Sequence, residues 1–353
     1  RPASHAPAAA IPASKRDSEA DRIRQMLHEL RTPVNAIQGF VEVIQFPFLA
    51  ETDLDKLAVP AGDERRELVR LANPLAETSP YLRTTLLPGL FGAVARNQSR
   101  GQTDLALYEV GTIFRGPVGV APMLPVDKRP SDEDLAAVRA ALPQQPAHVA
   151  CVVTGEWLPA TENAPAVTAG WQQAVAFAET VAWALGVRIE RTADSYAPFH
   201  PGRCARLVAG GVTVGYAGEL HPSVCQAYGL APRTAAAELS FDALVGANPG
   251  VGSITPVSSW PVAKEDVALI VDASVQAADV ERALRDGAGD LLEDVRLFDV
   301  YVSDAIGEGK KSLAFALRLR ASDRTLTEAE AAAVRDAAVA VAKERFDAVQ
   351  RIA

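Results

Sequence analysis

Short apolar runs separated by turns dominate the chain after residue 40, and most of them alternate apolar with polar residues as strands do. Stretches with apolar residues three or four positions apart, as in helices, lie between these runs. The pattern indicates an α+β domain with an antiparallel sheet and helices on one side of it. The expected strands are 41–46, 104–114, 147–155, 205–220 (a hairpin turning at Gly210 and Gly211) and 234–241, and the expected helices are 86–97, 132–142, 171–185 and 221–228.

The C-terminal part of the chain has a compact pattern of its own. A strand at 266–274 precedes a helix at 276–288, and strands at 293–302 and 310–321 precede a helix at 325–346. Thr327 and Glu330 form a capping box at the start of the last helix, and a short final strand follows it. This βαββαβ order is typical of a ferredoxin-like domain.

The pattern divides the chain into four parts. Residues 1–17 have the composition of a disordered linker, and residues 18–45 contain one apolar helical stripe with Pro33 inside it. The α+β domain occupies 46–250, and the ferredoxin-like domain occupies 255–353. The boundary between these two domains is placed in a stretch rich in Gly, Pro and Ser at 246–261.

Composition and charge narrow the function classes. The net charge is −9 over 353 residues, so no basic footprint covers the whole chain and any RNA contact must be local. The three cysteines are far apart, which supports neither a metal site nor a disulfide framework and is typical of a cytoplasmic protein. No apolar run reaches the ~20 residues of a membrane span, so we expect no contact with a membrane.

Several long motifs resemble the β subunit of bacterial phenylalanine–tRNA ligase. They are LANPLAETSPYLRTTLLPGLFGAVARNQSRG at 71–101, DLALYEVGTIFRG at 104–116, FHPGRCARL at 199–207 and GELHP at 218–222. From PVSSWPVAKEDVALIV onward, the chain resembles the ferredoxin-fold anticodon-binding domain of the same subunit. The resemblance begins near residue 39 and extends to the end of the sequence.

This resemblance implies a fold, an activity and partners. The family forms an α2β2 heterotetramer that joins phenylalanine to its tRNA with ATP and magnesium, in an active site that belongs to the α subunit. The β subunit has a related but inactive class II synthetase-like domain, here 46–250, and it binds tRNA. Its OB-fold and editing modules have no counterpart in this sequence, so we expect the chain to be the C-terminal portion, with no cofactor bound by itself.

The residues agree with an inactive class II core. Class II activation requires an Arg on the α-phosphate of ATP with a Glu two residues later, and a second Arg after a Gly-rich run. Arg115 stands at the first position, but Pro117 replaces the acidic partner, and no Gly-x-Gly-x-Gly run with a following Arg occurs downstream. We therefore expect no catalytic residue in this chain.

Five residues in the family motifs have structural and functional interpretations. Asn73, Arg83 and Pro88 in the first motif are assigned to structure or to a subunit interface, with substrate contact as the alternative. His200 and Arg203 receive the same assignment, in a turn with Gly202 at positive φ, with catalysis as the alternative.

Candidate RNA-binding residues lie on and before the strand at 312–320. Strict alternation places Leu313, Phe315, Leu317 and Leu319 on one face and Ala314, Ala316, Arg318 and Arg320 on the other. We assign RNA binding to Lys310, Lys311, Arg318 and Arg320. Solvated surface charge is the alternative, because 13 Lys and Arg against 18 Asp and Glu after residue 254 leave this domain at −5.

One segment resembles a different family. MLHELRTPVNAIQGF at 26–40 is similar to the H-box of sensor histidine kinases, in which the residue that matches His28 accepts phosphate. The similarity covers only 18–45, and no kinase ATP-binding domain follows. A fusion or an assembly artefact explains it, or a coincidental rewriting of one helix. The alternative function is a signalling protein in which a histidine kinase phosphorylates His28.

Overall fold

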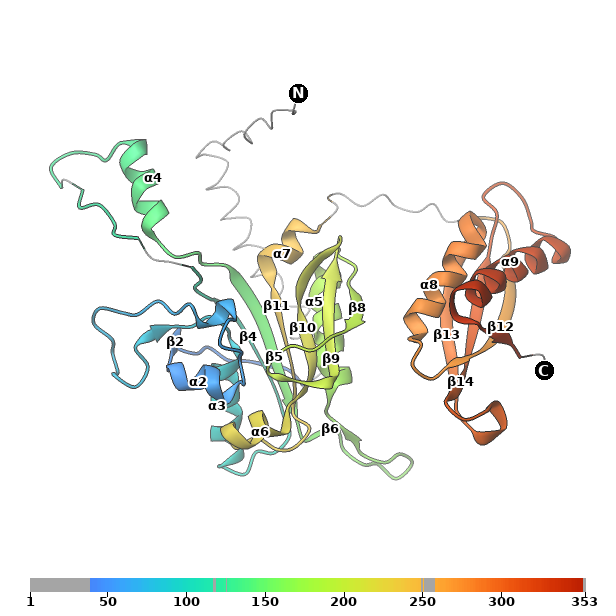
Figure 1. Cartoon of the computed structure of the whole chain (residues 1–353), viewed down its shortest axis with the longest axis horizontal. Helices are drawn as coiled ribbons and strands as arrows, with labels where there is room; N and C mark the ends of the chain where they lie inside the picture. The colour runs from blue at the N-terminus through green and yellow to red at the C-terminus, as the bar shows by residue number, and fades with distance from the viewer. Residues whose placement is uncertain (1–38, 117–118, 125, 249, 251–257, 352–353) are drawn as a thin grey trace. The chain divides into compact units, whose positions relative to one another are not determined.

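The computed structural model describes residues 39–116, 119–124, 126–248, 250 and 258–351. The chain separates into two compact units, residues 1–252 and residues 253–353 (Figure 1). The helix expected at 18–38 and His28 lie outside the described residues. Each unit has its own sheet and its own hydrophobic core.

Unit 1 is built on a seven-stranded sheet in the order β1-β4-β5-β11-β10-β9-β8. The sheet is antiparallel except at its edge, where β1 runs parallel to β4. A hairpin turn at Gly210 and Gly211, both at positive φ, joins β9 to β10 as predicted. The strands are β1 (Val41–Glu42), β4 (Leu105–Thr112), β5 (Ala147–Thr154), β8 (Glu190–Ala193), β9 (Phe199–Ala209), β10 (Val212–Leu220) and β11 (Ala235–Ser240).

Helices cover both faces of this sheet, so the expectation of helices on one side is wrong. On β5, Val149, Cys151 and Val153 pack in a core with α5 (Trp171–Ala184) and α7 (Phe241–Gly246). The intervening Ala150 and Val152 pack in a second core with α2 (Glu51–Lys56), α3 (Leu87–Gln98) and α6 (Pro222–Tyr228). A central strand that is apolar on both faces needs cover on both, and β5 is such a strand.

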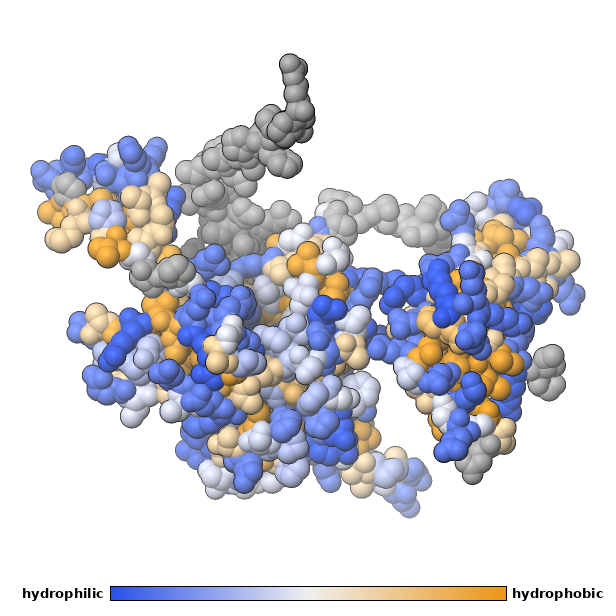
Figure 2. Space-filling model, viewed as in Figure 1, coloured by the Kyte–Doolittle hydropathy of each residue, from blue (hydrophilic) through white to orange (hydrophobic). Residues whose placement is uncertain are grey.

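Smaller elements of unit 1 lie around the sheet. They are the pair β2 (Phe48–Leu49) and β3 (Tyr81–Leu82), the pair β6 (Glu156–Leu158) and β7 (Val167–Thr168), the 3-10 helix η1 (Glu64–Arg66) and α4 (Asp132–Ala141). Ser131 caps α4 by accepting a hydrogen bond from the Asp134 amide. The connection from β4 to α4 exposes Val120, Met123 and Val126 completely. In Figure 2, apolar areas interrupt a mostly hydrophilic surface on the visible face.

Unit 2 has the predicted βαββαβ order, with the strands arranged β13-β14-β12-β15. The apolar faces of β12 and β14 pack against both helices in one core that includes Phe315, so the other sheet face is left without helices. Thr327 and Glu330 form the predicted capping box. The elements are β12 (Ala263–Asp272), α8 (Ala277–Ala288), η2 (Gly289–Leu291), β13 (Leu292–Tyr301), η3 (Asp304–Ile306), β14 (Lys310–Leu319), α9 (Glu328–Phe346) and β15 (Val349–Gln350).

A glycine permits the close crossing of α8 and α9. A Cβ atom at Gly287 would lie 2.7 Å from the Cα of Ala338, a distance at which the backbone of α9 would have to move. Ala338 and Ala342 of α9 are fully buried, so small residues line this crossing. The predicted fold class, a mixed α+β chain with a C-terminal ferredoxin-like domain, is confirmed.

Two further features follow from the described residues. Within them, none of the helices combines the length and the hydropathy that crossing a membrane requires. Cys151, Cys204 and Cys225 are free and buried, and burial raises the pKa of each thiol, to about 11 for Cys204. Their thiols are therefore protonated at neutral pH.

Candidate nucleic-acid interface

The open face of the unit 2 sheet is lined by small residues at its centre. Ala314 and Ala316 on β14 and Ala268 on β12 alternate with the buried residues of the core. Ala314 is directly opposite Ala268 in the strand register. Asp266 of β12 and Asp299 of β13 lie beside these alanines on the same face, so the small residues form a narrow strip bordered by acidic side chains.

Tyr301 and Arg351 meet above this face. Tyr301, the last residue of β13, is opposite Ser312 of β14, and Ser312 is opposite Ile270 of β12. Arg351 directly follows β15, and its guanidinium carbon lies 5.7 Å from the centre of the Tyr301 ring. Tyr301 is 45% exposed. An exposed aromatic ring and a guanidinium beside small residues suit the stacking of an unpaired nucleobase.

Arg318 and Arg320, two of the predicted RNA-binding residues, share one ion-pair partner. Strand alternation places both on the open face, and Leu313, Phe315, Leu317 and Leu319 are buried on the other face, as predicted. Arg318 Nη2 lies 3.2 Å and Arg320 Nε 3.0 Å from carboxylate oxygens of Glu293. Arg320 also donates to the carbonyl oxygens of Ser258 and Trp260, so its guanidinium holds the start of unit 2 in place.

The two predicted lysines lie at the beginning of β14. Lys310 is exposed and is opposite Asp272 of β12. Strand alternation places Lys311 on the helix-covered face rather than on the open face. Its Nζ donates to the carbonyl oxygen of Ala273 at 2.9 Å. The structure thus brings Lys310, Arg318 and Arg320 to one face of the strand and leaves Lys311 on the other.

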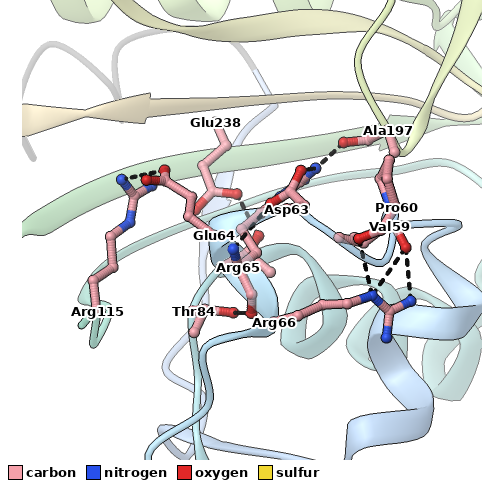
Figure 3. Close-up of polar contacts among 11 residues, drawn as sticks. Val59, Pro60, Asp63, Glu64, Arg65, Arg66, Thr84, Arg115, Ala197 and Glu238 are labelled. Carbon is pink, nitrogen blue, oxygen red and sulfur yellow. Dashed lines mark hydrogen bonds and ion pairs between the residues drawn. The ribbon is translucent and has the colours of Figure 1, made fainter. Parts of the chain in front are cut away.

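In unit 1, Arg115 and its neighbours are bound by groups of the chain itself (Figure 3). Arg115 Nη1 lies 2.8 Å from Oε1 of Glu64, the first residue of η1. On the same short helix, Arg65 pairs with Asp63 at 2.7 Å and donates to the Ala197 carbonyl. The Arg65 guanidinium also stacks on the ring of Tyr196 at 4.1 Å.

Two buried carboxylates occupy the same sheet face beside this network. Burial raises the pKa of Glu109, although Arg83 donates to it at 2.7 Å and acts in the opposite direction. Burial also acts to raise the pKa of Glu238, but hydrogen bonds from His148, Thr85 and the Leu86 amide outweigh it and lower that pKa. Each carboxylate is thus held by a basic side chain of the chain itself.

The other predicted residues are distributed over unit 1. Arg83 is buried, and its Nε donates to the Thr112 carbonyl oxygen. Asn73 is exposed in the loop before β3, and Pro88 is in the first turn of α3. His200 and Arg203 lie on β9, not in a turn, and Gly202 is not at positive φ, so that detail of the expectation is wrong.

Sequence reasoning missed Tyr301 and Arg351. Alternation along β13 places Tyr301 on the covered face with Val295 and Leu297, and only a bulge between Leu297 and Asp299, which the sequence does not reveal, moves it to the open face. Nothing local to residue 351 indicates that it follows a strand paired with β12, because that pairing joins segments about eighty residues apart.

Two family models match the chain. The model described as "Phenylalanyl tRNA synthetase beta chain CLM domain" matches residues 4–241, and the model described as "Ferredoxin-fold anticodon binding domain" matches residues 258–351. The first match includes residues 18–45, the segment similar to a histidine kinase H-box. The phosphoacceptor alternative at His28 receives no support from these matches.

Curated relatives agree with the family models. The phenylalanine–tRNA ligase β subunits of Cutibacterium acnes and Streptomyces avermitilis are 55% and 51% identical to the chain, over 91% and 93% of its length. That of Thermobifida fusca is 51% identical over 90% of the chain. The chain spans 38–40% of the length of these relatives.

Solved structures are more distant. A pyrrolysyl-tRNA synthetase from Desulfitobacterium hafniense is 16% identical, with 65% of this chain and 73% of that one covered at a TM-score of 0.45. The family model covers well over half of the chain. Its match ends at residue 241, where β11 has ended and α7 begins. The chain therefore belongs to the phenylalanyl-tRNA synthetase β chain family, with a ferredoxin-fold anticodon-binding domain at its C-terminal end.

Proposed function

We propose that the chain acts as the C-terminal part of a phenylalanine–tRNA ligase β subunit and that unit 2 binds the anticodon region of tRNA. In this function the chain supports the ATP- and magnesium-dependent attachment of phenylalanine to tRNA, in the cytoplasm. The observation that carries the RNA-binding part is the open sheet face of unit 2, where Tyr301, beside Ser312 in the strand register, lies 5.7 Å from Arg351, next to the pair Ala268 and Ala314.

Stacking is the main contribution we assign to this face. Unit 2 is acidic overall, so long-range attraction does not bring RNA to it. Base–aromatic stacking contributes about 1–3 kcal/mol per base and needs no net charge. On the same face, Lys310 supplies a phosphate contact two residues from Ser312, the strand partner of Tyr301, and Arg318 supplies another further along β14.

We propose further that the chain has no active site of its own. Arg115, which stands at the position of the motif 2 arginine, is paired with Glu64, and Glu109 and Glu238 on the nearby sheet face are paired with Arg83 and His148. The acidic residue that the class II motif requires two positions after this arginine is replaced by Pro117, and the second motif arginine is missing. Phenylalanine activation then belongs to an α subunit, with which the chain assembles as a heterotetramer.

Two assays on the purified chain test this proposal. Binding of tRNA that carries the phenylalanine anticodon should be measurable and should fall when Tyr301 is replaced by Ala. ATP–pyrophosphate exchange with phenylalanine should be absent from the chain alone and should appear on co-expression with an α subunit. Exchange that rises in proportion to the concentration of the chain alone would contradict the assignment of catalysis to the partner.

A further inference from the structure

Three segments of unit 1 that are separate in the sequence meet at one end of the strands β9, β10 and β11. β9 begins with residues 199–203, β10 ends at 219–220, and residues 231–234 lead into β11. The register joins them, because Leu220 is opposite Phe199 and Glu219 is opposite Ala235. This end of the sheet carries two groups of side chains, which together are called the His–Arg cluster: Glu219 with its ion-pair partners Arg203 and Arg233, and His200 with its ring neighbour His221.

One buried carboxylate holds two arginines in this cluster. Glu219 is 4% exposed, whereas the side chains of Arg203 and Arg233 are 48% and 69% exposed. Arg203 Nη1 lies 2.6 Å from Glu219 Oε1, and Arg233 Nε lies 3.5 Å from Glu219 Oε2. A guanidinium has five N–H donors, so each arginine reaches Glu219 with one nitrogen and presents others to solvent. The three groups together carry a net charge of +1.

Two histidines lie at the same end of the sheet. The rings of His200 and His221 are nearly parallel, with centroids 6.0 Å apart. Each Nδ1 accepts a hydrogen bond from a backbone amide two residues later, from Gly202 at 3.1 Å and from Ser223 at 3.2 Å. An imidazole that accepts at Nδ1 carries its proton at Nε2, so each ring has an N–H donor that points away from its own backbone.

The backbone at Arg233 is in an unfavourable conformation. Its φ is 65°, in the left-handed region that residues other than glycine seldom adopt. Such conformations persist where the surroundings fix them, and they are frequent at ligand-binding sites. Here this conformation and the pairing with Glu219 together determine where the Arg233 side chain lies.

We propose that the His–Arg cluster binds a phosphate group of an RNA backbone. Exposed guanidinium donors, with imidazole rings at the same end of the sheet, suit the oxygens of a phosphate. The surroundings of the cluster are polar, which favours RNA over a protein partner. Among the described residues, no large apolar side chain within 199–205 or 218–234 is exposed. The buried centre of a protein–protein interface is typically apolar. This contact is in unit 1, so it goes beyond the proposed function of unit 2.

A double variant, Arg203→Gln with Arg233→Gln, tests the proposal in the full chain. Binding of a short fluorescein-labelled oligouridine is measured by anisotropy over a series of KCl concentrations. We expect the affinity at low salt to fall about tenfold and the slope of log affinity against log salt to decrease by about one per arginine. The variant leaves the buried Glu219 without its arginines, so thermal unfolding on the same samples separates a loss of binding from a loss of folding.

Arg206→Gln is the matched control. Arg206 lies on the same strand, its side chain is 44% exposed, and it pairs with Asp194 outside the cluster. We expect its affinity and salt slope to equal those of the wild type. Tyr301→Ala, measured in parallel, separates the two RNA contacts: a loss with Tyr301→Ala but none with the double arginine variant leaves the proposed function intact and removes this one.

Titration with inorganic phosphate distinguishes an RNA backbone from a small phosphorylated ligand as the source of the bound phosphate group. Calorimetric titration with phosphate should give weak binding that the double variant abolishes. If the double variant loses phosphate binding but keeps RNA affinity, the cluster is a site for a small phosphorylated ligand and the phosphate chemistry stands. If both kinds of binding are unchanged, or if only co-purification with an α subunit is lost, the proposal is wrong.

Discussion

The sheets of unit 1 and unit 2 are both largely antiparallel, but they differ in how they are covered. Unit 1 has helices on both faces, and the polar side chains on one of these faces, Arg83, Glu109, His148 and Glu238, pair with one another in the interior. Unit 2 has helices on one face only, and its charged residues, such as Arg318 and Glu293, pair at the surface.

The comparison separates two uses of polar residues. In unit 1 a buried charge needs a partner within the chain, because a charge without one is costly in the interior. In unit 2 the open face leaves an aromatic ring and alanines accessible, so polar groups there can exchange a water contact for a ligand contact. A largely antiparallel sheet is thus enclosed within the interior of one unit and has an exposed face in the other, which is the face proposed to bind RNA.

The largest expected effect is the loss of a buried pair in unit 1. Replacing Glu109 by Ala leaves the buried guanidinium of Arg83 without its carboxylate and should lower the free energy of unfolding by about 3–5 kcal/mol. Glu293→Ala, at an exposed pair in unit 2, should cost at most about 1 kcal/mol. Urea denaturation of both variants checks this, and equal costs would remove the distinction between the two units.

Phe315→Ala tests the covered face of unit 2. Phe315 is fully buried between the sheet and the helices, so its truncation should cost about 3–5 kcal/mol from the lost contacts and the cavity left behind. RNA binding should fall only in proportion to the unfolded fraction. Circular dichroism and RNA titration on the same samples check this, and a loss of binding in fully folded protein would place Phe315 in the RNA-binding surface.

Tyr301→Ala tests the open face of the same sheet. We expect RNA affinity to fall by about 1–3 kcal/mol, because one stacking surface is removed. The free energy of unfolding should change by about 0.5 kcal/mol or less, since the ring is half-exposed. Tyr301→Phe keeps the ring and should retain most of the affinity. Wild-type affinity in Tyr301→Ala would exclude stacking on this ring.

The two units should also respond differently to acid. In unit 2, Arg324 and Thr327 lower the pKa of Glu330 to about 2, so its contribution to stability is complete above pH 4.5 and is lost as the pH falls toward 2. In unit 1, burial raises the pKa of Glu109, so its contribution decreases as the pH rises through 4.5.

Unfolding free energies of Glu330→Gln and Glu109→Gln, measured between pH 3 and pH 6, check these opposite signs. Glu330→Gln should flatten the loss of stability as the pH falls. Glu109→Gln should flatten the loss of stability as the pH rises. A steeper acid loss in Glu330→Gln than in the wild type would contradict the role of its ion pair with Arg324.

The smallest expected effect distinguishes Arg318 from Arg320. Arg318→Ala should reduce the salt slope of tRNA binding by about one and change stability within about ±0.5 kcal/mol. Arg320→Ala should cost more stability, because Arg320 holds the carbonyl oxygens of Ser258 and Trp260. Replacing both weakens tRNA binding without unfolding the domain. Wild-type affinity in this double variant at low salt would identify both residues as solvated charge.

The sequence by itself determined the fold class, the family and most of the longer elements, but not short elements such as α2, β8 and α7. Period and capping residues predicted α3, α5, α9 and the β9–β10 hairpin, because each depends on contacts within a few residues. Alternation placed Phe315 in the core and Arg318 on the opposite face for the same reason.

Only the tertiary structure decided which side chains meet. That Arg351 lies over Tyr301, that Glu219 holds both Arg203 and Arg233, and that helices cover both faces of the unit 1 sheet all depend on pairing between distant strands. Local patterns record which face of a strand is apolar, but they carry no information on which strand becomes its neighbour. The order of strands in a sheet is set by the packing of the whole unit.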